Sequence, residues 1–121
     1  MAKILIVDDS QSHLHHVKTL VDKEGYQVVT ADSGESGLAA ADAEIPDLIL
    51  LDIVMPDMSG FQVIRKLRKN ATTKQIPIIF ITSKQQESDR VWGLRQGARA
   101  YITKPVDRNE LLSAISSALA A

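Results

Sequence analysis

Short apolar runs alternate along the chain with longer segments in which apolar residues recur every three or four positions. The runs are 3–7, 27–31, 48–51, 76–81 and 100–103. Each run is too short for a buried helix, and its β-branched residues favour a strand. Leu48 to Leu51 is apolar at every position, which is typical of a parallel strand that is covered on both faces. The pattern therefore predicts five strands.

The segments between these runs predict five helices. The positions at helical spacing that we expect to point inward are Leu14, Val17 and Val21; Leu38, Ala41 and Ile45; Phe61, Ile64 and Leu67; Val91, Leu94 and Ala98; and Leu111, Leu112, Ile115 and Leu119. Caps are expected at Ser10, Ser33, Ser59 and Asp107, the last with Glu110. Gly93 inside the fourth helix costs about 1 kcal/mol relative to alanine, so we expect this helix to be mobile.

Strands that alternate with helices predict one doubly wound α/β domain with a parallel five-stranded sheet. If the strand order is 2-1-3-4-5, strands 1 and 3 flank the switch point, where open α/β sheets bind their ligands. The length of 121 residues fits one domain.

Composition narrows the classes of function. The chain has no cysteine, which excludes disulfides and thiolate zinc sites. Its net charge of -1, with both signs mixed along the chain, leaves no electrostatic footprint for nucleic acid or for an anionic membrane. No apolar run is long enough for a membrane span or a signal peptide. We expect a soluble, cytoplasmic protein.

The candidates for chemistry are polar residues at the ends of four of the predicted strands. Asp8 and Asp9 end the first strand, and Asp52 ends the third. Thr82 ends the fourth strand, and Lys104 follows the fifth. Because parallel strands end at one edge of a sheet, the three acids are expected to converge there.

This set of side chains favours phosphoryl transfer. Three carboxylates repel each other unless a cation holds them, and oxygen ligands favour Mg²⁺ or Mn²⁺. Lys104 supplies a point charge for a phosphate oxygen, and Thr82 supplies a hydroxyl donor. Asp52 is placed to be the nucleophile that forms an aspartyl phosphate.

The whole sequence resembles the receiver domains of response regulators, the CheY-like family. The motifs that carry the resemblance are Asp8-Asp9, Asp52 followed by Met55-Pro56 and Gly60, Thr82-Ser83, Tyr101 and Lys104-Pro105. The resemblance implies a flavodoxin-like, CheY-like (βα)5 fold, with residues 1–121 as one receiver domain. The runs 91–99 and 101–106 further resemble the PilH-type regulators of type IV pilus twitching motility.

The resemblance also implies a role for each motif residue. Asp52 would be the phosphoacceptor. The implied ligands of Mg²⁺ are Asp9, Asp52 and the Val54 carbonyl directly, and Asp8 through water. Thr82 and Lys104 would hold the phosphoryl group, Tyr101 would turn inward when Thr82 moves, and the Lys104-Pro105 bond would be cis.

Our interpretation is a stand-alone response regulator that accepts a phosphoryl group from the phosphotransfer domain of a CheA-like histidine kinase. It catalyses only its own phosphorylation and dephosphorylation. The signal would leave through helix 4, strand 5 and helix 5 to an unknown protein target, as a monomer or a phosphorylation-dependent dimer. The alternatives are a receiver fragment of a larger regulator or hybrid kinase, and a phosphorylation-independent interaction module.

Two other classes of protein fit the sequence less well. A phosphatase with an aspartyl nucleophile would need an Asp-x-Asp loop after the first strand, whereas the chain has Asp8-Asp9-Ser10. An FMN binder would need hydroxyls and amides there, because two acids repel a phosphate.

Three further features allow predictions of their own. His13 and His16 are one helical turn apart but have no third metal ligand in the sequence, which favours a solvated helix face over zinc. Trp92 is expected to be half exposed, either on a partner surface or as a packed rim. Val54 is an apolar side chain beside the path of the attacking water, which predicts slow self-dephosphorylation.

Overall fold

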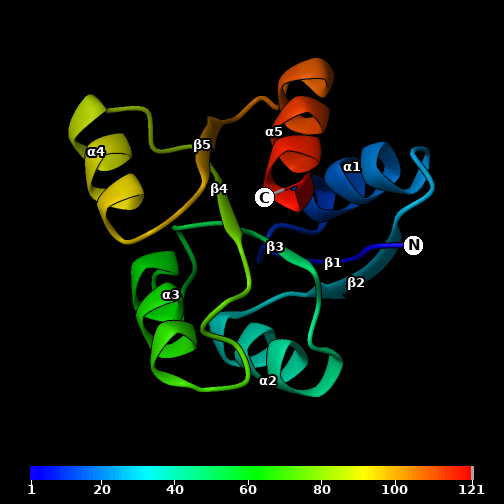
Figure 1. Cartoon of the computed structure of the whole chain (residues 1–121). Coiled ribbons are helices and arrows are strands. Elements are labelled where there is room, and N and C mark those ends of the chain that lie inside the picture. The colour runs from blue at the N-terminus through cyan, green and yellow to red at the C-terminus, as the bar shows by residue number, and fades with distance from the viewer. Residues whose placement is uncertain (121) are drawn as a thin grey trace.

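The structure is a computed structural model that describes residues 1–120 (Figure 1). Its strands are β1 (Lys3–Val7), β2 (Gln27–Ala31), β3 (Leu48–Leu51), β4 (Ile78–Thr82) and β5 (Ala100–Thr103). Its helices are α1 (Gln11–Asp22), α2 (Gly34–Glu44), α3 (Gly60–Lys69), α4 (Glu87–Arg95) and α5 (Arg108–Ala120). The alternation of five strands and five helices is the one that the apolar pattern predicts.

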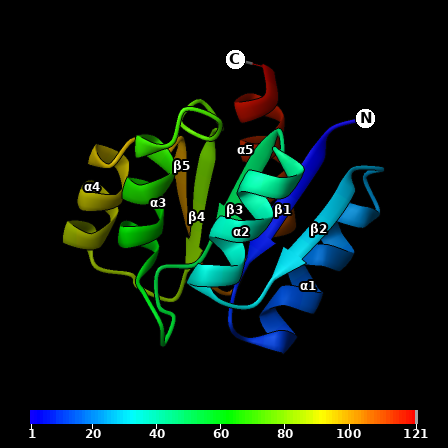
Figure 2. The same ribbon diagram turned by 90° about the horizontal axis from the view of Figure 1, so that it is seen from below.

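The strands form one parallel sheet of order β2-β1-β3-β4-β5 (Figure 2). Val7 pairs with both Ala31 and Leu51, so β1, β2 and β3 end side by side. The predicted order is therefore confirmed. It places the acids that follow β1 and β3 at adjacent strand ends.

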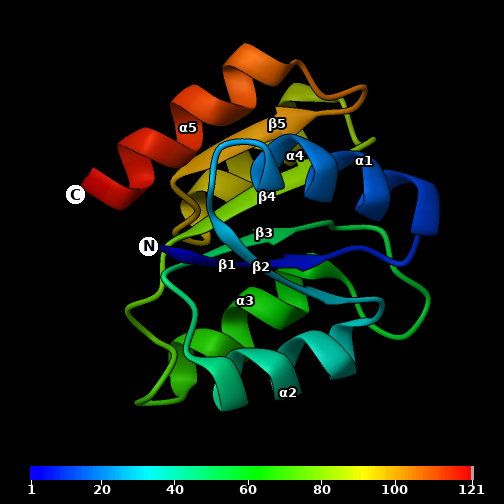
Figure 3. The ribbon, with the colours of Figure 1, turned by 90° about the vertical axis from the view of Figure 1, so that its right-hand side faces the viewer.

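Helices cover both faces of the sheet. Helices α1 and α5 lie on one face, and α2 and α3 lie on the other (Figure 3). Each face has its own apolar cluster because alternate residues of every strand point to opposite faces. Leu5, Ile49 and Phe80 pack toward α2, α3 and α4, whereas Ile6 and Ile79 pack toward α1 and α5.

The fourth strand differs from the predicted range 76–81. It begins at Ile78 and ends at Thr82. Pro77 has no N–H for the ladder, although its carbonyl accepts a hydrogen bond from the Ile49 N–H at 3.0 Å. The N–H of Ile76 instead closes a turn onto the Thr73 carbonyl.

Ile45 does not point inward as predicted. Helix α2 ends at Glu44, and Ile45 is a left-handed C-cap with φ 44° and 48% exposure. Its N–H still donates to the Ala41 carbonyl at 3.0 Å. Pro46 follows and disfavours a further helical residue, so the chain leaves the helix before Ile45 can turn toward the core.

The buried side of α4 also differs from the prediction. Val91 is 39% exposed, Leu94 is partly buried against the core, and Ala98 is buried but lies beyond the end of the helix. The buried residue of α4 is Gly93. A Cβ on Gly93 would meet Tyr101 Cδ2 at 3.0 Å, so the helix backbone rests directly on that ring. Val91, two residues away, lies about 200° around the helix and faces outward.

Candidate functional site

Three carboxylates meet at the carboxyl ends of the two central strands. One ligand atom from each of Asp8, Asp9 and Asp52 lies within 4.8 Å of the others. Asp8 and Asp52 are buried, and Asp9 is exposed. The structure therefore brings together the three acids that the sequence singles out.

Asp52 is held by the backbone of its own loop. Its N–H donates to the Val7 carbonyl at 3.0 Å, which continues the pairing of β3 with β1. Carboxylate atom Oδ1 accepts hydrogen bonds from the N–H groups of Ile53 at 2.7 Å and Val54 at 3.3 Å. These bonds fix the orientation of the carboxylate and leave Oδ2 facing Lys104.

Lys104 reaches across the sheet edge to two of the acids. Its Nζ lies 2.7 Å from Asp8 Oδ2 and 3.1 Å from Asp52 Oδ2, and its side chain is 9% exposed. The backbone N–H of Lys104 donates to the Thr82 carbonyl at 2.8 Å, which anchors the residue to the end of β4. The Lys104-Pro105 bond is cis, as the resemblance implies.

Burial raises the pKa of the Asp8 carboxyl, and the hydrogen bond from Lys104 opposes this effect. The Ser10 N–H also donates to Asp8 Oδ1, at 2.9 Å, while the charge of Asp52 raises the Asp8 pKa further. The Lys104 ammonium therefore does not fully offset the cost of burying the Asp8 carboxylate. The all-oxygen donor set and its excess negative charge fit a hard divalent cation.

Thr82 ends β4, the strand next to β3, and Tyr101 lies on the neighbouring strand β5. Thr82 is fully buried, and its Oγ1 accepts a hydrogen bond from the Lys84 N–H at 3.3 Å. The Tyr101 hydroxyl donates to the Lys84 carbonyl at 2.9 Å, and its ring packs edge-on against Phe80. Burial raises the pKa of Tyr101 to about 12, so the hydroxyl remains a donor at neutral pH. Both residues thus contact Lys84 in the loop before α4.

The remaining predicted residues, Val54 and Trp92, lie on different elements, Val54 in the loop after β3 and Trp92 in α4. Val54 is 50% exposed, and its backbone N–H is one of the two that hold Asp52. Trp92 is 46% exposed, and its ring lies 6.5 Å from that of Phe61 on α3. Trp92 is thus half exposed, as predicted.

The sequence did not predict two contacts that support the site, one made by His13 and one by Asp57. His13 Nδ1 lies 2.9 Å from Lys104 Nζ, and within residues 1–120 neither His13 nor His16 belongs to a group of metal ligands. Asp57 accepts hydrogen bonds from the N–H groups of Gly34 at 3.0 Å and Glu35 at 2.9 Å, so it ties the β3–α3 loop to the start of α2. No sequence signal pairs these residues, because each pair is far apart along the chain.

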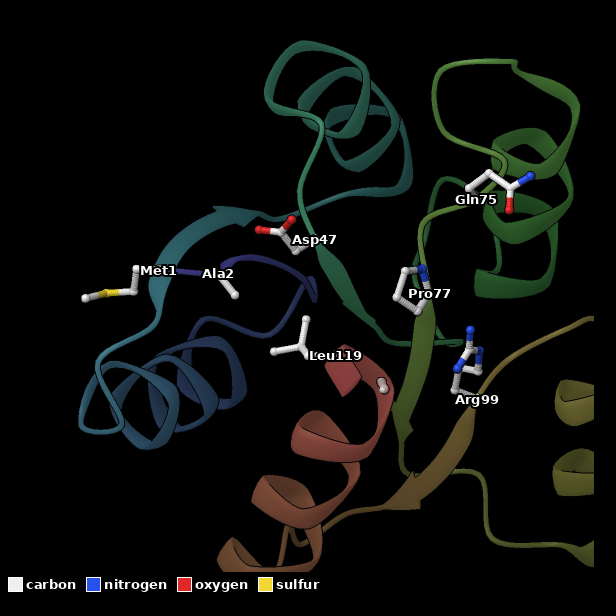
Figure 4. A pocket seen from close by; sticks show the side chains of 8 residues that line it. Met1, Ala2, Asp47, Gln75, Pro77, Arg99 and Leu119 are labelled. Atoms are coloured by element: carbon white, nitrogen blue, oxygen red, sulfur yellow. The ribbon is translucent and has the colours of Figure 1, made fainter. Parts of the chain in front are cut away.

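A cavity of about 430 Å³ lies at the opposite end of the sheet (Figure 4). Asp47, Pro77 and Arg99 line it, next to the starts of β3, β4 and β5. Only one acid lines this cavity, so the acidic cluster at the carboxyl ends remains the candidate site for chemistry.

A parallel sheet of this order, with acids and a lysine at its switch point, defines a CheY-like domain. Comparisons with known proteins agree. Residues 4–116 match the response regulator receiver domain. The chain is 52% identical to protein PilH of Pseudomonas aeruginosa over 120 residues, which cover 99% of both chains. It is also 41% identical to the response regulator PleD of Caulobacter vibrioides, over 96% of this chain but 26% of that longer protein.

Solved structures give the same result. The chain superposes on chemotaxis protein CheY4 of Vibrio cholerae with a TM-score of 0.91 and 34% identity, over 98% of this chain and 99% of that one. The chain therefore belongs to the response regulator receiver domain family, and it is not a conventional enzyme. Its three carboxylates are typical of a receiver Mg²⁺ site, and membership implies a cognate histidine kinase. Among residues 1–120, no helix combines the length and the apolar character that crossing a membrane requires.

Proposed function

We propose that Asp52 is the phosphoacceptor and that a histidine kinase, through a CheA-like phosphotransfer domain, is the donor. An oxygen of the Asp52 carboxylate attacks the phosphorus of a phosphohistidine. The new O–P bond forms as the N–P bond breaks, and the imidazole leaves with the electron pair. The observation that carries this proposal is the cluster of Asp8, Asp9 and Asp52, whose ligand atoms lie within 4.8 Å of one another, with Lys104 bridging Asp8 and Asp52.

Asp8, Asp9, Asp52 and the Val54 carbonyl are the residues that would hold Mg²⁺ or Mn²⁺. When bound, the cation would neutralise charge on the carboxylates and on the incoming phosphoryl oxygens. The excess negative charge and the burial of Asp8 support a cation here. Asp52 Oδ1 is already occupied by two backbone N–H groups, which leaves Oδ2 as the oxygen nearer to Lys104.

Lys104 and Thr82 would hold the transferred group. In the free protein the ammonium bridges Asp8 and Asp52, so it lies where a phosphoryl oxygen on Asp52 would need a positive charge. The Thr82 hydroxyl would donate to another phosphoryl oxygen. A shift of Thr82 toward that oxygen would move Lys84, which the Tyr101 hydroxyl contacts.

This contact suggests how phosphorylation reaches a partner. The chain from Thr82 through Lys84 to Tyr101 links the site to β5 and to the loop before α4. The exposed surface of α4, β5 and α5 would then change its fit to a protein target, with the domain as a monomer or as a phosphorylation-dependent dimer. The similarity to PilH supports a role in type IV pilus twitching motility or chemotaxis-like signalling. A kinase that uses ATP would place this reaction in the cytoplasm.

The test is the intact mass of the purified protein after incubation with acetyl phosphate and Mg²⁺. We expect one phosphoryl adduct in the wild type and none with EDTA or in Asp52→Asn. The matched control is Asp32→Asn, because Asp32 follows β2 at the same sheet edge but lies outside the cluster. The control should be phosphorylated like the wild type.

Two results would contradict the proposal. Absence of an adduct in the wild type would favour a phosphorylation-independent interaction module. An adduct that persists in Asp52→Asn would assign the phosphoacceptor to another residue.

A further inference from the structure

The ammonium of Lys104 has three hydrogen-bond partners, and one of them, His13, is outside the cluster of acids. Its Nζ lies 2.7 Å from Asp8 Oδ2, 2.9 Å from His13 Nδ1 and 3.1 Å from Asp52 Oδ2. An ammonium has three N–H groups, so these acceptors use all of them. His13 comes from α1, and the proposed reaction assigns it no role.

The chemistry of this contact is well defined. The Lys104 ammonium can donate to Nδ1 only if the imidazole is neutral and carries its proton on Nε2. A neutral acceptor orients the ammonium without cancelling its charge. In this respect His13 differs from Asp8 and Asp52, both of which form ion pairs with Lys104.

The position of His13 is set by the start of α1. Ser10 caps this helix, and its Oγ accepts a hydrogen bond from the His13 N–H at 3.4 Å. The N–H of the same serine donates to Asp8 Oδ1 at 2.9 Å. Ser10 therefore fixes two of the three acceptors of Lys104 relative to each other.

Lys104 needs such an orienting contact because space is open beside it. A cavity of about 200 Å³ lies between α1 and the loop after β5, lined by His13, His16, Lys104, Pro105 and Val106 among others. A lysine side chain has four rotatable methylene bonds, so it can swing into this space when its acceptors are lost. The two acids are the acceptors that a cation and a phosphoryl group on Asp52 would engage.

We propose that His13 is a positioning residue for Lys104. His13 keeps the ammonium directed at the site when Asp8 and Asp52 stop binding Lys104 and instead hold the cation and the phosphoryl group. This inference rests on the proposed function. It attributes to His13 a contribution to the rate of phosphorylation at saturating donor, and none to the affinity for Mg²⁺.

Three substitutions of His13 test the geometry of the acceptor atom. His13→Leu removes the acceptor. His13→Asn places an amide oxygen close to the position of Nδ1, whereas His13→Gln places its amide close to that of Nε2. The control is His15→Leu on the same helix, because the His15 ring makes no hydrogen bond within residues 1–120.

The measurement is the rate of adduct formation by intact mass, at saturating Mg²⁺ and across acetyl phosphate concentrations, with Mg²⁺ affinity from calorimetry. Loss of one neutral hydrogen bond predicts a rate about 3- to 10-fold lower in His13→Leu at saturating donor. His13→Asn should recover most of the rate and His13→Gln should not. The Mg²⁺ affinity and the rate of His15→Leu should match the wild type.

Each other pattern overturns the inference. If His13→Leu reacts like the wild type, the contact has no part in the reaction. If Asn and Gln are equally slow, or equally fast, the atom at the Nδ1 position is not what matters, and this comparison decides the question even if His13→Leu fails to fold. Absence of an adduct in the wild type would instead remove the proposed function itself.

Discussion

The two loops that flank the site are held very differently. In the β3–α3 loop (residues 52–59) the Ile53 carbonyl accepts a hydrogen bond from the Gly60 N–H at 2.9 Å, and Asp57 caps α2. A capping box between Ser59 and Gln62 then starts α3. The β4–α4 loop (residues 83–86) has exposed residues throughout, and α4 begins without a side-chain cap. Its tethers to the site both involve Lys84.

The two helices that follow these loops differ in the same way. Helix α3 buries Val63, Ile64 and Leu67, whereas the buried residue of α4 is Gly93. Elements with few buried apolar side chains open at lower free energy than the rest of a domain. The loop that carries Asp52 therefore has a fixed geometry, whereas the β4–α4 loop and α4, which lie next to Thr82 and Tyr101, open more easily.

The largest effect is expected from Gly60→Ala, at the first residue of α3, whose backbone packs against the β3–α3 loop, called the tight loop below. An added Cβ would overlap the Asp52 carbonyl oxygen and lie 2.9 Å from Ile53 Cα, and neither backbone atom can move without disturbing Asp52. We expect the free energy of unfolding to fall by about 3 kcal/mol, with loss of Mg²⁺ binding. Urea denaturation measures the first and calorimetry the second. If the variant were as stable as the wild type, the loop would not be rigid.

Val54→Asn tests whether the side chain at this position of the tight loop limits attack by water on the acyl phosphate. Val54 is 50% exposed beside Asp52, and an amide there can orient the water that attacks the acyl phosphate. We expect dephosphorylation to become about tenfold faster, which corresponds to about 1.4 kcal/mol in the barrier. Decay of the adduct after removal of acetyl phosphate measures this rate. Val91→Asn, an exposed valine on α4, serves as the control and should leave the decay unchanged.

Tyr101→Phe removes one of the hydrogen bonds that hold the β4–α4 loop and keeps the aromatic ring. Loss of the hydrogen bond to the Lys84 carbonyl should lower the free energy of unfolding by about 1 kcal/mol and speed amide exchange in residues 83–86. Because the pKa of Tyr101 rises from 10.0 to about 12 on folding, its contribution is complete below pH 10 and is lost as the pH rises through about 12. Phenylalanine should remove this alkaline loss. Unchanged exchange rates would mean that the loop has another anchor.

Gly93→Ala tests how closely α4 packs against the rings of Phe80 and Tyr101, and it is the counterpart of Gly60→Ala. The new Cβ would lie 3.0 Å from Tyr101 Cδ2 and 3.2 Å from Phe80 Cδ2, both in side chains that can shift. Alanine gains about 1 kcal/mol of helix propensity, which offsets this crowding. We expect a stability within about 1 kcal/mol of the wild type and a changed fluorescence of Trp92. If the free energy of unfolding fell as much as in Gly60→Ala, α4 would be held as rigidly as the tight loop.

The smallest effect is expected from Asp57→Ala, which removes the link between the tight loop and α2. The N–H groups of Glu35 and Gly34 lower the pKa of Asp57 below its usual 3.8. The stabilisation is therefore present above that value and is lost as the pH falls through the lower folded pKa. We expect the urea midpoint of the wild type to fall more steeply below pH 4 than that of Asp57→Ala. The control is Asp32→Ala, because the Asp32 carboxylate accepts no backbone N–H within residues 1–120. Its urea midpoint should change with pH as that of the wild type does.

Local pattern was sufficient for the fold and for most of the site. Acids after β1 and β3, a threonine at the end of β4 and a lysine after β5 could be placed at one sheet edge, because parallel strands all end there. The same reasoning failed where helix periodicity was the only guide. Val91 fits an apolar period, but the close approach of the Gly93 backbone to Phe80 and Tyr101 turned it outward.

The sequence by itself thus determined the five strands, their alternation with helices and the identity of the acidic cluster, since apolar spacing and strand-end residues are set by near neighbours in the chain. Only the tertiary structure decided that Lys104 donates to His13 and that Asp57 caps α2. These partners are 91 residues apart in the first pair, and 23 and 22 in the second. Contacts of that separation depend on how whole elements pack, and no local pattern encodes them.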